Sequence, residues 1–254
     1  MQTKVKTTAE IDSMRVSGQM LASVLSVLEK TAAVDMTTKD LANIAKQELR
    51  SLGGQPTFLG YQGFPDVLCV SVNEEVVHGI PSTTKVLDSG DVVSLDFGVT
   101  YKGMITDSAI TIILGKARPN DQKLVNATKL SLEAAIDIMK DNIRVGDISG
   151  AIQGVLEPAG YGIVRDLVGH GVGHELHEEP NIPNHGKPMT GQKLLAGMTV
   201  AVEPMATLGS YQVITAPDGW TILTKDNSRA AHFEHTILIT DTGAEVLTNL
   251  KDVR

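Results

Sequence analysis

Two carboxylates in one short stretch of the chain are spaced so that they could act together. Asp96 and Asp107 lie in GDVVSLDFGVTYKGMITDSAITII, residues 90–113, whose alternating apolar residues predict a β-hairpin. If the chain turns between Tyr101 and Lys102, the two acids are equidistant from the turn and face each other across the ladder. Like charges directly opposite are destabilising, so the pair needs a cation or a shared proton. The alternative is a solvated edge hairpin that carries two unrelated acids.

A second pair of acids repeats the pattern of the first. Two parts of the hairpin match two later segments in the same order: GDVVSLD (90–96) matches GMTVAVE (197–203), and TDSAITI (106–112) matches FEHTILI (233–239). Glu203 is thereby the counterpart of Asp96, and Glu234 is the counterpart of Asp107. The alternative is that short β patterns align by chance.

If the two halves pack about a pseudo-two-fold axis, these four carboxylates meet at its centre. Four ionised carboxylates in one cleft would repel one another strongly at a low effective dielectric constant. Two divalent cations would neutralise them. Oxygen-rich ligand sets suit Mn, Fe, Co or Zn, and paired ions lie roughly 3.5–4 Å apart in hydrolytic sites.

Three of the seven histidines lie in GHGVGHELH, at His170, His174 and His177. A helical zinc-protease motif needs His-Glu-x-x-His, and this segment is one residue short of it. In an extended segment His170 and His174 share a face, while His177 points to the other unless a bulge intervenes. We therefore expect one ligand and one further histidine beside the site, and no zinc site built from all three. From the residues alone, the lone His78 before a turn is interpreted as structural.

The elements around these residues repeat one plan, in which two helices precede a group of strands. Apolar spacing and capping residues predict helices at about 7–30, 38–52, 120–139 and 148–159. A strand is expected at 67–72, and Asp218-Gly219 is a strong turn signal between the two later acids. In the hairpin, one face is predicted to be core: Val93, Leu95, Phe97 and Val99.

The composition limits the classes of function. The chain has 254 residues and a net charge of -8, with acids spread along its length. It has no basic stripe for nucleic acid and no run of the roughly 20 apolar residues that a membrane span needs. The single cysteine, Cys69, fits a reducing compartment, and the opening MQTKVKTTAE lacks the apolar core of a signal peptide. We expect a cytoplasmic protein with no membrane contact and no direct nucleic-acid function.

Five segments together resemble a known family. NEEVVHGIP, GDVVSLDFGVTYKGMITDSA, GHGVGHELHEEP, GMTVAVEP and FEHTILIT are similar, in order and spacing, to the short bacterial form of the type I methionine aminopeptidases. The resemblance covers about residues 5–250. It implies the α+β pita-bread fold, with two pseudo-symmetric halves and a curved, mostly antiparallel sheet covered by helices. It also implies one catalytic domain over residues 1–254, with halves at about 5–115 and 116–250.

The family removes the N-terminal methionine from nascent proteins and peptides and prefers a small penultimate residue. The resemblance implies two divalent ions per chain, of Co, Mn, Fe, Zn or Ni. Asp107 and Glu234 would bridge both ions, Asp96 would hold one, and His170 with Glu203 would hold the other. The ions would activate a shared water, and the free α-amine of the substrate would coordinate the ion on the Asp96 side.

The resemblance also implies catalytic roles for three residues. Glu203 would carry the proton of the water to the leaving amine. His177 would donate a hydrogen bond to the scissile carbonyl and stabilise the oxyanion. His78 would position the scissile amide, so that both histidines are also substrate-binding residues.

The methionine pocket should be apolar and shaped for an unbranched thioether. By resemblance it is lined by Tyr61, Phe64, Cys69, Leu176 and Trp220, and the alternative for each is an ordinary place in the core. The chain departs from the family at Phe64, Leu176 and Phe233, where relatives often carry Tyr, Phe and Tyr. These replacements stay apolar, so methionine should still fit.

Two other functions remain open. The same fold hosts X-Pro aminopeptidases, which usually carry a separate N-terminal domain. It also hosts homologues that have lost metal ligands and act as binding proteins, here for ribosomes or nascent chains, without catalysis. The expected partners are nascent polypeptide N-termini, with the ribosome as a further candidate, and we expect the chain to act as a monomer.

Overall fold

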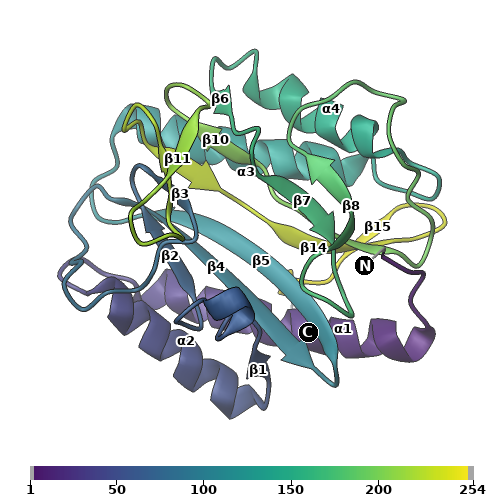
Figure 1. Ribbon diagram of the computed structural model, residues 1–254, viewed down its shortest axis with the longest axis horizontal. Coiled ribbons are helices and arrows are strands. Elements are labelled where there is room, and N and C mark those ends of the chain that lie inside the picture. The colour runs from purple at the N-terminus through teal and green to yellow at the C-terminus, as the bar shows by residue number, and fades with distance from the viewer. Residues whose placement is uncertain (1–2, 251–254) are drawn as a thin grey trace.

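Helices and strands follow one another in two similar blocks in the computed structural model, which describes residues 3–250 (Figure 1). Each block is a pair of helices followed by strands. The helices are α1 (Thr8–Thr31), α2 (Thr38–Leu52), α3 (Pro119–Asp137) and α4 (Val145–Leu156), with a short 3-10 turn at Tyr61–Gly63. The strands of the first block are β1 (Gln55–Pro56), β2 (Cys69–Val72), β3 (Glu75–Val77), β4 (Val92–Tyr101) and β5 (Met104–Ile113).

The second block holds shorter strands. They are β6 (Gly162–Ile163), β7 (Val168–Gly171), β8 (Glu178–Pro183), β9 (Thr199–Val202), β10 (Met205–Thr207), β11 (Val213–Thr215), β12 (Ile222–Thr224), β13 (Ala230–His232), β14 (His235–Ile239) and β15 (Ala244–Val246). Residues 1–2 and 251–254 of the expected domain lie outside the described part of the chain. Within residues 3–250, no helix has the length and apolar character needed to cross a membrane.

Local sequence signals explain where the helices begin and end. Thr7 and Glu10 form a reciprocal capping box at the start of α1. The second helix ends at Gly53, whose φ of 81° is the left-handed conformation that glycine adopts most readily. The fourth helix begins three residues earlier than predicted, because the Asp147 side chain accepts a hydrogen bond from the Arg144 amide and starts the helix at Val145.

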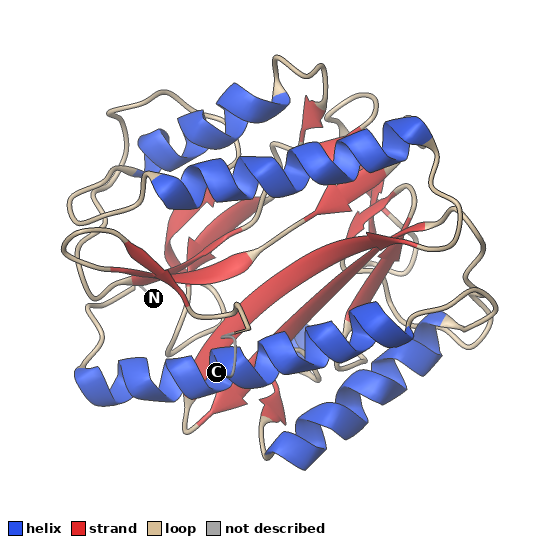
Figure 2. Cartoon of the chain, turned by 180° about the vertical axis from the view of Figure 1, so that it is seen from behind, coloured by secondary structure: helices blue, strands red, loops and turns tan. Residues whose placement is uncertain are grey.

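Antiparallel strands form the sheets, and helices cover one side of them. One sheet has the order β1-β4-β2 with β5 beside β4, and the largest has the order β15-β14-β9-β7-β8. Two smaller sheets have the orders β13-β10-β6 and β11-β12-β3. Viewed from behind, α1 and α2 lie on one side of the molecule and α3 and α4 on the other, with the strands between them (Figure 2).

The two main apolar clusters lie between these helix pairs and the strands. The cluster under α1 and α2 contains the four hairpin residues that were predicted to be core, from Val93 to Val99. The cluster under α3 and α4 reaches β9, β13 and β14. Each helix pair therefore buries one face of the strands and leaves the opposite face available for polar side chains.

The register of the β4–β5 hairpin differs from the prediction. Gly98 pairs with Asp107, and Asp96 pairs with Ala109, so the two acids are diagonal neighbours and do not face each other directly. The turn consists of Lys102 and Gly103, both with positive φ, and its centre lies one residue later than expected. The loop needs two residues in the left-handed region, and that requirement moves every pair by two positions. The side of the sheet is unchanged, because side chains alternate with a period of two.

The two blocks are joined where β5 meets the segment before β14. Ala109 and Glu234 form an antiparallel bridge, with the Glu234 amide donating to Ala109 at 2.9 Å and the Ala109 amide donating to Glu234 at 3.2 Å. On one side of the bridge, the Thr236 hydroxyl bonds the backbone of Asp107. On the other, the Thr111 hydroxyl bonds the backbone of His232. We call this row of contacts the seam.

Candidate active site

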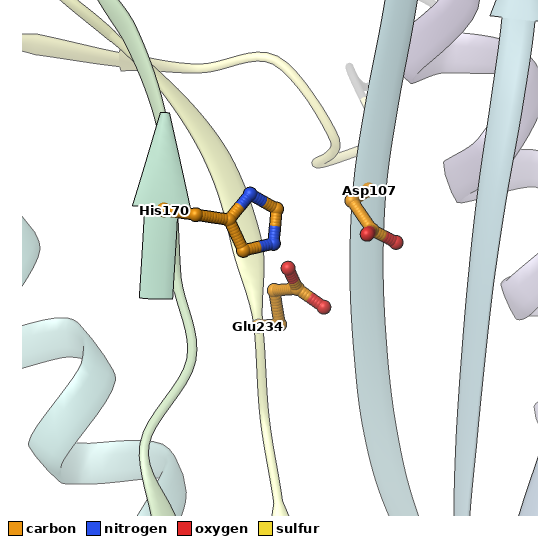
Figure 3. A group of neighbouring side chains, drawn as sticks. All are labelled: Asp107, His170 and Glu234. Carbon is orange, nitrogen blue, oxygen red and sulfur yellow. The ribbon is translucent and has the colours of Figure 1, made fainter. Parts of the chain in front are cut away.

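Three potential ligands from both blocks lie against the seam. Asp107 comes from β5, His170 from β7 and Glu234 from the residue before β14, and one ligand atom of each lies within 4.8 Å of the others. Their side chains converge on one space between the strands (Figure 3). All three residues are buried.

The remaining two candidate ligands are neighbours of this group. Asp96 shares a face of the hairpin with Asp107, and its strand pairs it with Cys69 of β2. Glu203 follows β9, and its Oε1 atom lies 3.5 Å from Nε2 of His170. The structure thus brings all five residues to one place. Their assignment as metal ligands stays a prediction.

The gathered acids perturb one another because little water reaches them. Burial raises the pKa of Asp96 to about 7. Burial also raises the pKa of Asp107, Glu203 and Glu234 well above the usual range, and repulsion from the neighbouring carboxylates raises them further. A group of buried acids that ionise this reluctantly is a costly arrangement for a folded protein, and such arrangements are characteristic of functional sites.

The unpaired atoms at this point fit a divalent metal. Within the described residues, one carboxylate oxygen on each of Asp96, Asp107 and Glu234 is buried without a hydrogen-bond partner. The Nδ1 atom of His170 lies 3.0 Å from the carbonyl oxygen of Gly171, which leaves the Nε2 lone pair directed at the acids when Nδ1 carries the proton. Burial lowers the pKa of His170 to about 3, so the imidazole is neutral and able to bind a metal. Several oxygens with one imidazole suit borderline divalent ions.

The histidines are arranged differently from the prediction for an extended segment. The rings of His170 and His177 lie 4.4 Å apart, whereas His174 points away to Glu10 and Glu178. The reason is that β7 ends at Gly171 and residues 172–177 form an irregular loop, so strand alternation does not apply to them. The expectation that only two of the three histidines approach the site agrees with this geometry.

His177 and His78 flank the space above the acids. The Tyr61 hydroxyl lies 2.8 Å from Nδ1 of His177, and when it donates there the proton of the neutral ring is on Nε2. His78 has a φ of 59°, a conformation that a side chain other than glycine adopts only under constraint from its surroundings. Burial lowers the pKa of His78 to about 4, so its ring is neutral at pH 7.

A cavity of about 160 Å³ opens onto the acids. All five residues predicted for the methionine pocket line it: Tyr61, Phe64, Cys69, Leu176 and Trp220. Phe64 and Trp220 meet edge to face at 5.2 Å. A larger hollow of about 410 Å³ lies between α1 and α3, and none of the five candidate ligands is among the described residues that line it.

Sequence reasoning missed two further residues that line the cavity of about 160 Å³, Phe58 and Gln62. A weak signal for Phe58 was present in Gly98 of β4. A Cβ atom at Gly98 would lie 2.6 Å from the Phe58 ring, so the glycine makes room for that ring.

His232 is another residue that sequence reasoning missed. It is 1% exposed, its Nε2 atom lies 3.7 Å from Oε2 of Glu203, and neither ring nitrogen has a hydrogen-bond partner within residues 3–250. Burial lowers its pKa to about 3. A signal existed, because His232 lies two residues before Glu234 and strand alternation places both on the same face.

Comparisons with known proteins identify the family of the chain. Metallopeptidase family M24 matches residues 12–241 of the chain. The methionine aminopeptidase of Clostridium acetobutylicum is 43% identical over 244 residues, which are 96% of this chain and 98% of that protein. Methionine aminopeptidase 1 of Bacillus subtilis is 43% identical over 245 residues, with the same coverage of 96% and 98%.

Solved structures give the same result. The crystal structure of a methionine aminopeptidase from Thermotoga maritima superimposes with a TM-score of 0.96 at 46% identity, covering 98% of this chain and 100% of that one. The prolidase of Pyrococcus furiosus superimposes with a TM-score of 0.77 at 22% identity, and the match covers 97% of this chain and 66% of the prolidase. At that identity the second likeness concerns the fold alone.

Proposed function

The chain belongs to metallopeptidase family M24, and from this premise we propose that it hydrolyses the first peptide bond of polypeptides and releases their N-terminal methionine. Near-full-length similarity to methionine aminopeptidases carries this conclusion. The resemblance to the type I enzymes and the α+β pita-bread fold are confirmed. The two alternatives, a non-catalytic binding protein and an X-Pro aminopeptidase, are not favoured, because several methionine aminopeptidases are 40% or more identical to this chain over nearly its full length.

The enzyme is a metal-dependent hydrolase, and its own residues indicate where the metal would lie. We assign two divalent ions, of Co, Mn, Fe, Zn or Ni, to the five residues Asp96, Asp107, His170, Glu203 and Glu234. When bound, such ions lower the pKa of water and polarise a carbonyl oxygen. The buried, unpartnered carboxylate oxygens support this assignment, since a cation is the partner that they lack.

Three side chains around the cavity would move or hold protons. Glu203 would accept the proton of the attacking water and pass it to the leaving amine, because it lies at the cavity wall and its pKa is raised by burial. His177 would donate from Nε2 to the carbonyl oxygen as negative charge develops there, with Tyr61 fixing the ring. His78 would hold the scissile amide in line.

The cavity would accept the methionine side chain. Its apolar wall excludes water, and rings such as Phe64 and Trp220 offer favourable contacts to a thioether sulfur. Leu176 and Cys69 are both nearly fully buried and close the inner part of the wall. We infer that a small penultimate residue is preferred, as the resemblance implies.

The substrates would be the N-termini of newly made chains. We infer that the enzyme meets them in the cytoplasm, acts as a monomer and can contact the ribosome. The net charge of -8 supports no direct nucleic-acid function. The single domain and its division into two related halves, at about 5–115 and 116–250, also remain proposals.

A peptide assay tests the proposed function. Protein prepared without metal is incubated with Met-Ala-Ser or with an Xaa-Pro peptide, in the presence of Co²⁺ or Mn²⁺. The proposal expects release of methionine from the first peptide and no release from the second. Cleavage of the Xaa-Pro peptide alone would indicate the X-Pro aminopeptidase. An absence of turnover with every metal would indicate the binding protein.

A further inference from the structure

The loop that carries Leu176 and His177 has few main-chain contacts of its own. Residues 172–177 connect β7 to β8 and belong to neither a helix nor a strand; we call them the site loop. The Val172 amide donates to Thr199 at 3.1 Å, and the Gly173 carbonyl accepts from Ile105 at 2.7 Å. Within the loop, the Gly173 amide donates to the Glu175 carbonyl at 3.1 Å, and side chains supply the further contacts described below.

Residues 3–10, which we call the N-terminal strap, lie directly against this loop. The Thr3 amide donates to Glu179 at 2.5 Å, and the Lys6 amide donates to Gly197 at 2.8 Å. The strap then continues into the first turn of α1. The Lys6 side chain passes Gly173 so closely that a Cβ atom there would lie 2.4 Å from Lys6 Cε. A side chain at residue 173 would therefore push the end of the Lys6 side chain aside.

The strap reaches the loop through a buried ion pair. Lys6 Nζ lies 3.0 Å from Oε2 of Glu178, and both side chains are 0% exposed. The same ammonium donates to the Thr3 hydroxyl at 3.0 Å and to the Lys4 carbonyl at 3.3 Å, so that each of its three hydrogens has an acceptor. Glu178 directly follows the site loop and is the neighbour of His177 in the chain.

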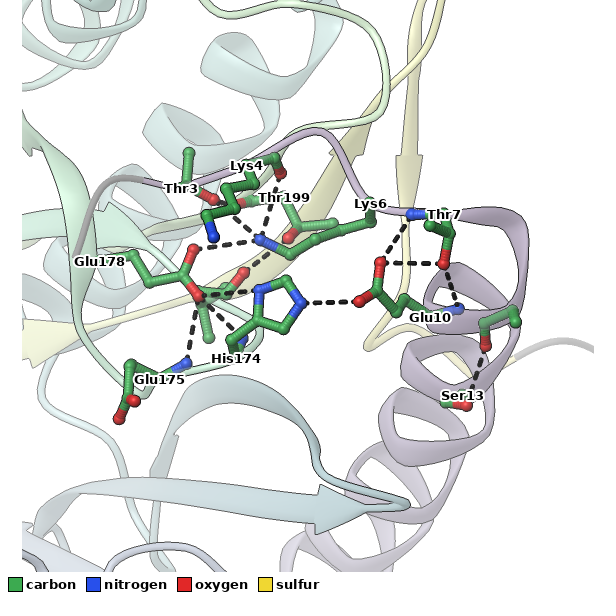
Figure 4. A network of polar contacts seen from close by, with 12 residues as sticks. Thr3, Lys4, Lys6, Thr7, Glu10, Ser13, His174, Glu175, Glu178 and Thr199 are labelled. Carbon is green, nitrogen blue, oxygen red and sulfur yellow. Dashed lines mark hydrogen bonds and ion pairs between the residues drawn. The ribbon is translucent and has the colours of Figure 1, made fainter.

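The other oxygen of Glu178 holds the loop backbone. Its Oε1 atom accepts hydrogen bonds from the amides of His174 at 2.7 Å and of Glu175 at 3.1 Å. On the far side of the loop, Nε2 of His174 lies 2.7 Å from Oε1 of Glu10 in α1. The strap therefore contacts the loop region at two points: Lys6 binds Glu178, and Glu10 binds His174 (Figure 4).

We propose that the N-terminal strap sets the position of His177 and Leu176 in the active site, with Lys6 and Glu10 as positioning residues that act through Glu178 and His174. The inference rests on the proposed function, since it assigns His177 a place in the reaction. These two contacts hold a loop that otherwise lacks regular hydrogen bonding. Its position matters because a displacement of about 1 Å in a catalytic group can lower a rate about 100-fold.

The main test is Lys6→Met, which keeps the length of the side chain and removes its charge. It leaves the Glu178 carboxylate buried without its cation, so the loop should shift. With Met-Ala-Ser and saturating Mn²⁺, kcat should fall about 10- to 100-fold with a smaller change in KM. Mn²⁺ affinity measured by calorimetry should stay within about threefold, because the strap contacts none of the five assigned ligands. Hydrogen exchange at the amides of His174 and Glu175 should accelerate.

Two further variants separate positioning from simple loss of stability. The double variant Lys6→Met/Glu178→Gln removes the unpaired charge and should regain part of kcat. His174→Ala removes the partly exposed contact with Glu10 and the 3.6 Å contact between the ring and Glu178, and it leaves the Lys6–Glu178 ion pair in place. It should lower kcat about 3- to 10-fold even if Lys6→Met folds poorly. The matched control is Arg15→Gln, which breaks the ion pairs of Arg15 with Asp12 and Glu245, both outside the strap and the site loop, and should leave kcat within about twofold.

The outcomes distinguish this inference from the proposed function. If wild-type protein releases no methionine, the proposed function fails, whereas hydrogen exchange still reports whether the strap holds the loop. The inference is overturned if Lys6→Met and His174→Ala both keep the wild-type kcat. It is also overturned if exchange at His174 and Glu175 is unchanged, or if Arg15→Gln lowers kcat as much as Lys6→Met does.

Discussion

The hydroxyl of Thr236 bonds both backbone polar groups of Asp107: it accepts from the amide at 2.8 Å and donates to the carbonyl at 2.8 Å. The Thr236 side chain thereby makes the two hydrogen bonds that a neighbouring strand would otherwise make to the backbone of Asp107. Glu234 lies two residues before Thr236, and its bridge to Ala109 in the same seam determines its position. The relative position of the two acids thus depends on side-chain hydroxyls as well as on strand pairing.

Thr236→Val should therefore weaken metal binding. The substitution keeps the shape of the side chain and leaves the buried amide and carbonyl of Asp107 without a partner, at about 1–3 kcal/mol each. We expect a decrease of about 10- to 100-fold in Mn²⁺ affinity by calorimetry, as for other groups that orient ligands. Thr128→Val, which removes a local hydrogen bond inside α3, is the control. Equal metal affinity in both variants would contradict the role of the seam.

Metal-free protein should lose stability as the pH rises above about 6.5. The folded pKa of Asp96 is raised to about 7, and the pKa values of Asp107, Glu203 and Glu234 are raised well above the usual range. Their contribution to stability is therefore complete below the unfolded pKa values of about 4 and is lost as the pH rises from there through the folded values. Buried His170 and His232, with pKa values lowered to about 3, act in the opposite direction, but only below about pH 6.5.

Thermal unfolding between pH 6.5 and 8.5 measures this effect. The Tm of metal-free protein should fall across the range, and the increase in Tm on adding Mn²⁺ should grow, because the cation binds the ionised carboxylates. A Tm that rises with pH in the absence of metal would show that the acids are not buried together.

Two substitutions test the roles of the acids. Glu203→Gln should lower kcat for Met-Ala-Ser by about 100- to 10,000-fold, because the amide accepts no proton from water. Asp107→Ala should abolish turnover and weaken metal binding, while it raises the Tm of metal-free protein by relieving repulsion. Full activity in either variant would remove this mechanism.

Trp220→Ala tests the methionine pocket. Trp220 is partly exposed in the turn between β11 and β12, and its ring meets Phe64 and His78. Its loss should raise KM for Met-Ala-Ser about tenfold, with a smaller change in kcat, because it contacts the side chain and not the reacting bond. Tyr211→Ala, at an exposed aromatic residue outside the cavity, should leave KM unchanged. If kcat fell by a larger factor than KM rose, Trp220 would take part in the hydrolytic step and not only in binding methionine.

His232→Leu tests why a histidine lies buried beside Glu203. Its ring nitrogens lack partners within the described chain, so an apolar replacement should leave the Tm of metal-free protein unchanged or raise it by a few degrees. If the ring restrains Glu203, kcat should fall about tenfold at the same time. A lower Tm together with an unchanged kcat would mean that the ring serves packing alone.

The sequence was sufficient for the side of the sheet on which each acid lies, because strand alternation depends only on the parity of the residue number. The sequence pattern did not predict the hairpin register, because the register depends on the left-handed conformations of Lys102 and Gly103. Gly103 was the signal, and a two-residue loop with glycine second would have placed the turn correctly.

The loop around His177 was less predictable. Its shape depends on Lys6 and Glu10, which are more than 160 positions away in the chain, and no local pattern encodes such contacts. The same holds for His232, whose proximity to Glu203 arises from the pairing of β10 with β13. By contrast, capping residues such as Thr7 act within one turn, and the starts of α1 and α2 were predicted correctly.

The seam has a consequence for when, during synthesis of the chain, the active site can form. Asp96 and Asp107 precede residue 116, whereas His170, Glu203 and Glu234 follow it. The backbone of Asp107 and the hydroxyl of Thr236 that bonds it are 129 positions apart. During synthesis, the active site therefore stays incomplete until Glu234 has been added to the growing chain. A protease nick between α3 and β5 would likewise leave two inert fragments, and activity would return only on their reassociation.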